Sequence, residues 1–355
     1  MSTFCAVNTP QHVMNLAQAV LGGTIRPDVD CVVFDYRRGR NSYTSRVLSG
    51  TTHLLGQLLP QVKFRIWPLW RGISNAQIAL AVRKCGRNAD TLVLGMYPSG
   101  LWERSQLRQE GCKTILLDDG ASSLSLDFAQ VLDDGNSLGR SLAYRNAVRA
   151  LAGRRPTNAT ATPVLYTAFP VANSPWPTVT HDYSALREAL KRDTARDIPM
   201  ASTARVWLDS NYGPLLGADC HRAMISSAIQ EFGVDTYVPH RRTSFKFSRE
   251  IAHDFDLAVV RPTVPAELVI GPWTQAGVSV LTPPASLATT GQLFVEDPGS
   301  LTMVCVSEWL RQYRERHGLS GSEGFREEIL NAETVERSAL QGGRVPVNSL
   351  PLEAI

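Results

Sequence analysis

Short apolar runs alternate with amphipathic stretches through the first half of the chain. Each run ends in polar or glycine residues, as expected of buried strands, and the runs span 4–7, 31–34, 64–67, 91–94 and 114–117. Helices are predicted between or after the runs, at 10–21, 44–58, 74–86, 100–109 and 122–132. Thr9 and Pro10 suit the N-cap and first position of the first helix. This alternation predicts a parallel sheet with helices on its faces.

A change of composition separates this half from the rest. Between 153 and 200 the chain is rich in Pro, Thr, Asn and Ser, around a strand-like run at 164–169 and a charged helix at 183–192. The alternation then restarts, with strands predicted at 205–208, 236–238, 257–260 and 278–281, and helices at 220–232, from 286 and at 308–316. We therefore predict an α/β protein with two Rossmann-like lobes: a domain over 1–170, a linker over 171–200, a second domain over 201–310, and a C-terminal helix and tail over 311–355.

Composition is consistent with two globular domains and narrows the partners. The chain has 355 residues, of which 43% are hydrophobic and 19% charged, so it has enough apolar residues for two ordinary cores. The net charge is +3 and the arginines are spread along the chain. This pattern favours a small anionic substrate over nucleic acid.

Cysteine use and the N-terminus predict a cytoplasmic protein. The six cysteines are scattered singly, without a Cys-x-x-Cys pair, which is typical of reduced thiols and offers no structural metal cage. The N-terminus lacks the basic start and apolar core of a signal peptide, and no apolar run is long enough to cross a bilayer. We expect the protein to stay inside the cell.

Polar residues directly after the predicted strands are the first candidates for a site. Ligands of open α/β sheets bind beyond the carboxyl ends of the strands. The residues in this position are Asn8, Tyr97, Asp118, Asp119, Ser210, His240 and Thr282.

Asp118-Asp119-Gly120 follows the apolar run at 114–117. Glycine permits a tight turn there, which would bring the carboxylates to the edge of the sheet as candidate bases. A turn followed by a helix N-cap explains the same residues equally well. A second Asp-Asp-Gly, at 133–135, follows a predicted helix, so its glycine is interpreted as a helix stop.

His240 follows the predicted strand at 236–238 and precedes Arg241 and Arg242. An imidazole titrates near neutrality, so it suits a general acid or a hydrogen-bond donor to phosphate. A basic surface loop is the alternative. The other histidines lack this strand-end context; they are His12, His53, His181, His221, His253 and His317.

Two further segments bear on metal and phosphate binding. Asp254 and Asp256 have the Asp-x-Asp spacing of metal-dependent glycosyltransferases, but they precede a predicted strand, so we interpret them as a loop. Thr282 and Ser286 flank the start of a predicted helix, where hydroxyls and backbone N–H groups suit a phosphate or simple capping. Gly-x-Gly-x-x-Gly and Walker sequences are absent.

In order and context these segments resemble the bacterial sialyltransferases of the lipooligosaccharide sialyltransferase and polysialyltransferase type. The resemblance rests on 7–10 with Asn15, 95–99 with Trp102, 117–120, 208–216, 237–242, 265–267 and 282–287. It implies a GT-B fold with a cleft between an N-terminal acceptor lobe and a C-terminal donor lobe. The chain departs from the family at Arg241, where the family has Pro, and in its paired hydroxyls, which are present only as Thr282 and Ser286.

The resemblance also implies a role for each candidate residue. Asp119 would be the general base, with Asp118 as the alternative, and His240 the general acid acting on the departing CMP phosphate. The donor-binding residues would be Arg242, Arg241, Glu267, Thr282, Ser286 and Ser210. The acceptor-binding residues would be Asn8, Tyr97, Ser99 and Trp102. No metal and no other cofactor is expected, because CMP leaves as a monophosphate.

The sequence thus predicts an inverting, metal-independent transferase. Its donor would be a CMP-activated nonulosonic acid, of the sialic, pseudaminic or legionaminic type, or CMP-Kdo. Its acceptor would be a glycan or glycolipid of lipopolysaccharide or capsule, which could bring the enzyme to the periphery of the inner membrane. A glycerophosphotransferase using CDP-glycerol and a non-catalytic nucleotide- or glycan-binding protein are the alternatives. Nucleic acid is not expected as a partner.

Overall fold

A computed structural model of the chain divides into two compact units, Met1–Asp193 and Thr194–Ile355. The structure describes residues 2–36, 43–69, 77, 81, 89–95, 112–120, 163–169, 171, 174, 176–191, 204–210, 212, 216–284, 291–319, 321–342 and 346–351. Each unit is built on its own parallel sheet, as the sequence predicts.

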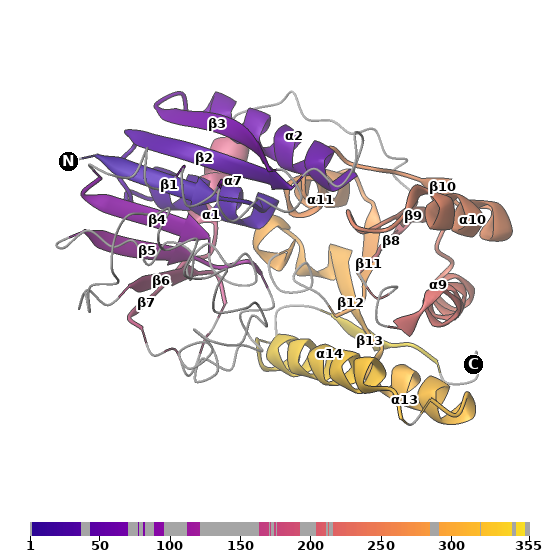
Figure 1. Cartoon of the computed structure of the whole chain (residues 1–355). Coiled ribbons are helices and arrows are strands. Elements are labelled where there is room, and N and C mark those ends of the chain that lie inside the picture. The colour runs from indigo at the N-terminus through magenta and orange to yellow at the C-terminus, as the bar shows by residue number, and fades with distance from the viewer. Residues whose placement is uncertain are drawn as a thin grey trace. The chain divides into compact units, whose positions relative to one another are not determined.

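The first unit contains a seven-stranded sheet in the order β3-β2-β1-β4-β5-β6-β7 (Figure 1). Its strands are β1 (Thr3–Val7), β2 (Val29–Tyr36), β3 (Val62–Leu69), β4 (Thr91–Gly95), β5 (Lys113–Leu117), β6 (Val164–Thr167) and β7 (Thr178–Thr180). All neighbouring strands run parallel. The strand order reverses between β1 and β4, so a ligand is expected beyond the carboxyl ends of these two strands.

Three helices are described in the first unit: α1 (Pro10–Leu21), α2 (Tyr43–Leu58) and α7 (Ser184–Lys191). Helix α1 begins as predicted, with Pro10 in its first turn and the Thr9 side chain accepting a hydrogen bond from the backbone N–H of His12. Phe4 and Ala6 of β1 point into one core with Phe34 of β2 and Leu94 of β4. The predicted helices at 100–109 and 122–132, and most of that at 74–86, lie outside the described residues.

The second unit repeats the architecture with a six-stranded sheet in the order β10-β9-β8-β11-β12-β13. Its strands are β8 (Arg205–Leu208), β9 (Thr236–Val238), β10 (Ala258–Val259), β11 (Ser279–Thr282), β12 (Leu301–Cys305) and β13 (Val347–Ser349), all parallel to their neighbours. Here the order reverses between β8 and β11, which places a second expected ligand site beyond these strands.

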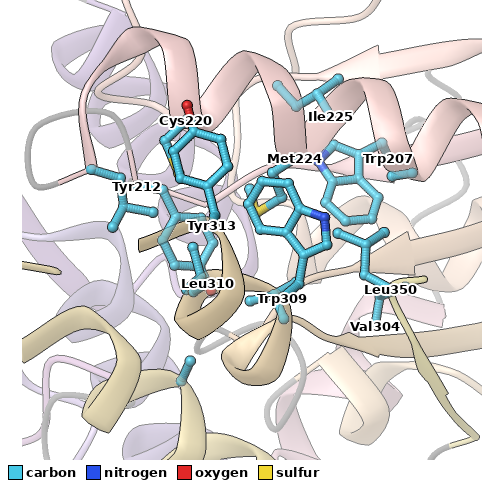
Figure 2. Close-up of a cluster of buried hydrophobic side chains, with 14 of the residues drawn as sticks. Trp207, Tyr212, Cys220, Met224, Ile225, Val304, Trp309, Leu310, Tyr313 and Leu350 are labelled. Carbon is cyan, nitrogen blue, oxygen red and sulfur yellow. The ribbon is translucent and has the colours of Figure 1, made fainter. Parts of the chain in front are cut away.

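The core of the second unit is rich in aromatic side chains (Figure 2). The described helices of this unit are α9 (Ala218–Phe232), α10 (Phe245–Phe255), α11 (Glu267–Gln275), α13 (Ser307–Arg316) and α14 (Glu323–Gly342). Trp207 of β8 and Met224 of α9 belong to one cluster with Trp309 and Tyr313 of α13, and the rings of these last two stack at a centroid distance of 5.2 Å.

The C-terminal part of the chain differs from the prediction. The region predicted as a C-terminal helix and tail, 311–355, also contains the long helix α14 (Glu323–Gly342) and the strand β13 (Val347–Ser349), both in the second unit, and Leu350 joins its core. The predicted linker over 171–200 also changes place, because β7 completes the first sheet and α7 contacts α1. The division between the two units follows Asp193, within the segment predicted as a linker.

Glu336 of α14 joins that helix to the N-terminus of α13. Its carboxylate accepts hydrogen bonds from the backbone N–H groups of Val306 and Ser307, at 2.8 and 3.0 Å, and from the Ser307 hydroxyl. An acidic group from another helix therefore caps α13, where it also complements the helix dipole.

Removing this cap should destabilise the second unit. We expect Glu336→Ala to lower the free energy of unfolding by about 2–3 kcal/mol, because buried N–H groups lose their acceptor. Urea unfolding followed by tryptophan fluorescence measures the change. The matched control is Glu333→Ala on the same helix, which removes an exposed ion pair with Arg311 and should cost less than about 1 kcal/mol. Equal losses in the two variants would contradict the capping role.

Candidate functional site

Asp118 is a buried anchor for the turn after β5. Its Oδ1 accepts the N–H of Gly120 at 2.9 Å, and its Oδ2 accepts the N–H of Ala168, beyond β6, at 3.1 Å. Gly120 has φ of 99°, a conformation that favours glycine, so the predicted turn is present. Burial raises the pKa of Asp118 to about 6, although hydrogen bonds from Thr167 and the two backbone N–H groups act in the opposite direction.

Asp119 is placed differently from its neighbour. Its side chain is 7% exposed, while that of Asp118 has no exposed surface. Asp119 Oδ1 is buried without a hydrogen-bond partner among the described residues, and Nε2 of His12 lies 3.7 Å from it. Of the two aspartates, Asp119 is therefore the one with carboxylate capacity left for a ligand.

A buried polar face of α1 holds the same turn in place. Asn15 Nδ2 donates to the backbone carbonyl of Asp118 at 3.0 Å, and its Oδ1 accepts the hydroxyl of Tyr183. Gln11 Nε2 donates to the Tyr183 hydroxyl at 2.5 Å, and Gln18 Oε1 accepts the N–H of Leu186 at 2.9 Å. These contacts fix α1 against the end of β5 and the start of α7, which explains why one helix buries so many polar groups.

Asn8 lies at the same edge of the sheet, directly after β1. Its Oδ1 is buried and has no hydrogen-bond partner in the part of the chain that the structure describes. An unpaired buried carbonyl oxygen is costly unless a ligand or water pairs with it. The strand-end residues of β1 and β5 thus both offer oxygen atoms to a polar ligand.

In the second unit a buried network crosses the ends of β8 and β9. Asp209 follows β8, and its Oδ1 lies 2.7 Å from Nε2 of His221 on α9. Its Oδ2 accepts the hydroxyl of Tyr237, in β9, at 2.6 Å. Burial raises the pKa of Tyr237, with the charge of Asp209 acting in the same direction. This network fixes the backbone beside Ser210, one of the predicted site residues.

Comparison with known proteins defines the fold class. No protein-family model matches the chain, and the curated proteins gave no significant match. A UDP-N-acetylglucosamine 2-epimerase candidate from Listeria monocytogenes has a TM-score of 0.54 and 10% identity, over 99% of this chain and 92% of its own. S. aureus MnaA in complex with UDP has a TM-score of 0.52 and 10% identity, over 86% of this chain and 79% of its own. Two Rossmann-like units in one chain agree with these likenesses. The fold is of the GT-B type.

The GT-B prediction is confirmed at the level of the fold alone, because the identities are low. The GT-B domain of a sialyltransferase from Photobacterium damselae also matches, at 12% identity over 98% of this chain and all of its own. Its TM-score of 0.45 is too low to support a conclusion about donor or acceptor.

His240 follows β9 in the second GT-B unit, as predicted. Its Nδ1 accepts the backbone N–H of Arg242 at 3.2 Å, which leaves a proton on Nε2 of the neutral ring. Burial lowers the pKa of His240 well below its usual value, and the charges of Arg241, Arg242 and His221 act in the same direction.

The remaining donor-lobe predictions fall at the ends of three elements. Ser210 follows β8 and Thr282 ends β11, so the two stand on either side of the reversal in strand order. Thr282 is buried, and its hydroxyl donates to the carbonyl of Pro283 at 3.2 Å. Glu267 begins α11. Ser286, Tyr97, Ser99 and Trp102 lie outside the described residues.

The segment with Asp254 and Asp256 is helical rather than a loop. Asp254 belongs to α10 and pairs with Arg222, and Asp256 is the C-cap of that helix, with φ of 51°. In the described part of the chain, no three metal-ligating side chains gather, and no helix is long and apolar enough to span a membrane.

Three polar residues beside the candidate site were not predicted: His12, Asp209 and His221. His12 and His221 lie on helices and so lack a strand-end position. Asp209 directly follows a strand, so the rule that selected Ser210 could have found it.

Proposed function

We propose that the protein is an inverting, metal-independent glycosyltransferase that moves a sialic-acid-like sugar from its CMP derivative to a glycan hydroxyl. The observation that carries the proposal is the difference between two adjacent carboxylates at the edge of a GT-B sheet. Asp118 is fully used in holding the turn, whereas Asp119 keeps a buried oxygen without a hydrogen-bond partner in the described structure. A general base needs such a carboxylate.

Asp119 acts on the acceptor. It takes the proton from the attacking hydroxyl as the acceptor oxygen bonds to the anomeric carbon of the donor. The bond from that carbon to the phosphate oxygen breaks, and the electron pair leaves with CMP. One displacement through an oxocarbenium-like state inverts the configuration, and no covalent enzyme intermediate forms.

His240 acts on the leaving group. With Nδ1 occupied by the N–H of Arg242, Nε2–H is the group left to meet a phosphate oxygen. Arg241 and Arg242 supply positive charge beside it, and charge-assisted contacts of this kind stabilise a developing phosphate anion. Ser210, Thr282 and Ser286 complete the proposed phosphate contacts, and Glu267 the contacts to the ribose hydroxyls.

The nature of the donor and acceptor rests on the family resemblance. We propose a CMP-activated nonulosonic acid or CMP-Kdo as donor. The acceptor would be a glycan or glycolipid bound near Asn8, Tyr97, Ser99 and Trp102. The enzyme would work in the cytoplasm, at the inner membrane when its acceptor is a glycolipid, and would need no metal or other cofactor.

Donor binding and turnover test the proposal directly. We expect CMP-sialic acid, or a pseudaminic, legionaminic or Kdo analogue, to raise the melting temperature of the purified protein by mass action. The same donor should release CMP when a glycan acceptor is present, and EDTA should leave the rate unchanged. UDP-N-acetylglucosamine serves as the control nucleotide sugar.

Three outcomes would contradict the proposal. Release of UDP would show that the fold likeness to UDP-binding proteins extends to the donor. If CMP is released from CDP-glycerol and from none of the CMP-activated sugars, the protein is a glycerophosphotransferase. A strict requirement for a divalent cation would remove the metal-independent mechanism.

A further inference from the structure

His12 is the third residue of α1 and is fully buried. Its backbone N–H donates to Oγ1 of the N-cap Thr9 at 3.2 Å, so the first helical turn fixes its position. Because α1 starts directly after β1, His12 stands where the strand order of the first sheet reverses. The helix N-terminus carries partial positive charge, which stabilises an anion beside it.

The His12 ring packs against Gly95, at the end of β4. A Cβ atom at Gly95, the last residue of β4, would lie 2.4 Å from both Cε1 and Nδ1 of His12. Side chains never approach this closely, so residue 95 must be glycine while the ring keeps its place. A side chain at residue 95 would therefore displace the His12 ring.

Nε2 of the same ring lies 3.7 Å from Oδ1 of Asp119. A movement of about half an ångström would bring the two atoms within hydrogen-bond distance, and contacts of catalytic groups are often long before substrate binds. The His12 side chain has no exposed surface, whereas that of Asp119 is 7% exposed. Asp119 is therefore the member of the pair that a substrate can reach, and His12 lies behind it.

We propose that His12 is a positioning residue for Asp119, an inference that rests on the proposed transferase function. Its Nε2–H donates to Oδ1 and fixes the carboxylate, which leaves Oδ2 to take the proton from the acceptor hydroxyl. The acceptor O–H bond breaks as the new C–O bond forms. The proton stays on Asp119, and His12 keeps its own.

Variants at residue 12 test this role. We expect His12→Leu to lower kcat by about 10- to 100-fold with the KM for the CMP donor unchanged, because positioning acts on the chemical step. His12→Gln retains an N–H donor and should recover most of the loss. Exposed His53, replaced by Leu, is the control and should match wild type.

Two further measurements distinguish a positioning role of His12 from misfolding of the variants and from another role of the residue. Gly95→Ala displaces the ring without altering its chemistry and should lower kcat as His12→Leu does. In protein with ¹⁵N-labelled histidine, Asp119→Asn should shift the imidazole signals of His12, whether or not the protein turns over.

The outcomes separate this inference from the proposed function. Wild-type turnover in folded His12→Leu, or His12 signals insensitive to Asp119→Asn, would overturn the positioning role alone. If kcat falls equally in His12→Leu and His12→Gln, and as far as in Asp119→Asn, His12 itself is the base, and the positioning role is overturned. Absence of CMP release by the wild-type protein would overturn both.

Discussion

Replacing Asp119 with Asn should lower kcat by about 100-fold or more, the usual loss when a general base is removed. The change is nearly isosteric, so donor binding and folding should persist. Single-turnover measurements with excess enzyme report the chemical step. The thermal shift produced by the donor checks binding in the same samples.

The neighbouring carboxylate provides the contrast for this experiment. Both oxygens of Asp118 accept backbone N–H groups, so Asp118→Asn places an amide where two acceptors are needed. We expect that variant to lose stability more than catalytic rate. Asp30→Asn, which removes an exposed charge paired with Arg65, controls for charge alone. If Asp119→Asn turns over as the wild type does and folded Asp118→Asn is inactive, then Asp118 is the base and Asp119 is not.

The local sequence does not distinguish Asp118 from Asp119 as the base; the family resemblance alone favours Asp119. Adjacent residues with the same side chain share their local sequence, and they are distinguished by contacts with distant residues, such as that of Asp118 with Ala168, fifty positions later, and that of Asp119 with His12. His12 was missed for the same reason. Its significance comes from Asp119 and Gly95, which are distant in the chain and meet it only through the parallel pairing of β1, β4 and β5.

Strands β1, β4 and β5 were predictable because each is a short apolar run that is almost completely buried. Helix α14 was missed although its buried residues Phe325, Ile329, Ala332 and Glu336 have helical spacing. One of these positions carries a buried glutamate, and the exposed face carries Leu330 and Leu340, so the hydrophobic pattern is blurred. The Glu336 carboxylate accepts hydrogen bonds from the N-terminus of α13, a contact that the local sequence does not reveal.

Strand β7 illustrates a different limit. Its three exposed residues include one apolar side chain, Val179, which is too short a run to predict a strand within the polar segment taken as a linker. They join the sheet through backbone pairing with β6, which any sequence can make at an edge. The polar composition of this region fits a linker, but it fits an exposed edge strand equally well.

His240 is the second residue whose loss should be severe. We expect His240→Ala to lower kcat by about 100-fold or more, because the departing phosphate loses its donor. Exposed His253, replaced by Ala, is the control, since its imidazole faces solvent on α10. A rate within twofold of wild type in His240→Ala, with donor binding retained, would remove His240 from the mechanism.

The lowered pKa of His240 decides between its two candidate roles. Burial and three neighbouring basic residues hold the pKa well below 6.5, so the ring gains its positive charge only as the pH falls through that lowered value. At neutral pH it is then a hydrogen-bond donor through Nε2, and kcat/KM should not fall between pH 6.5 and 8 through its titration. His240→Gln, which offers an N–H at nearly the same place, should retain more activity than His240→Ala. If the bound phosphate instead raises the pKa enough for proton transfer, kcat will decline as the pH rises, and Gln will be no better than Ala.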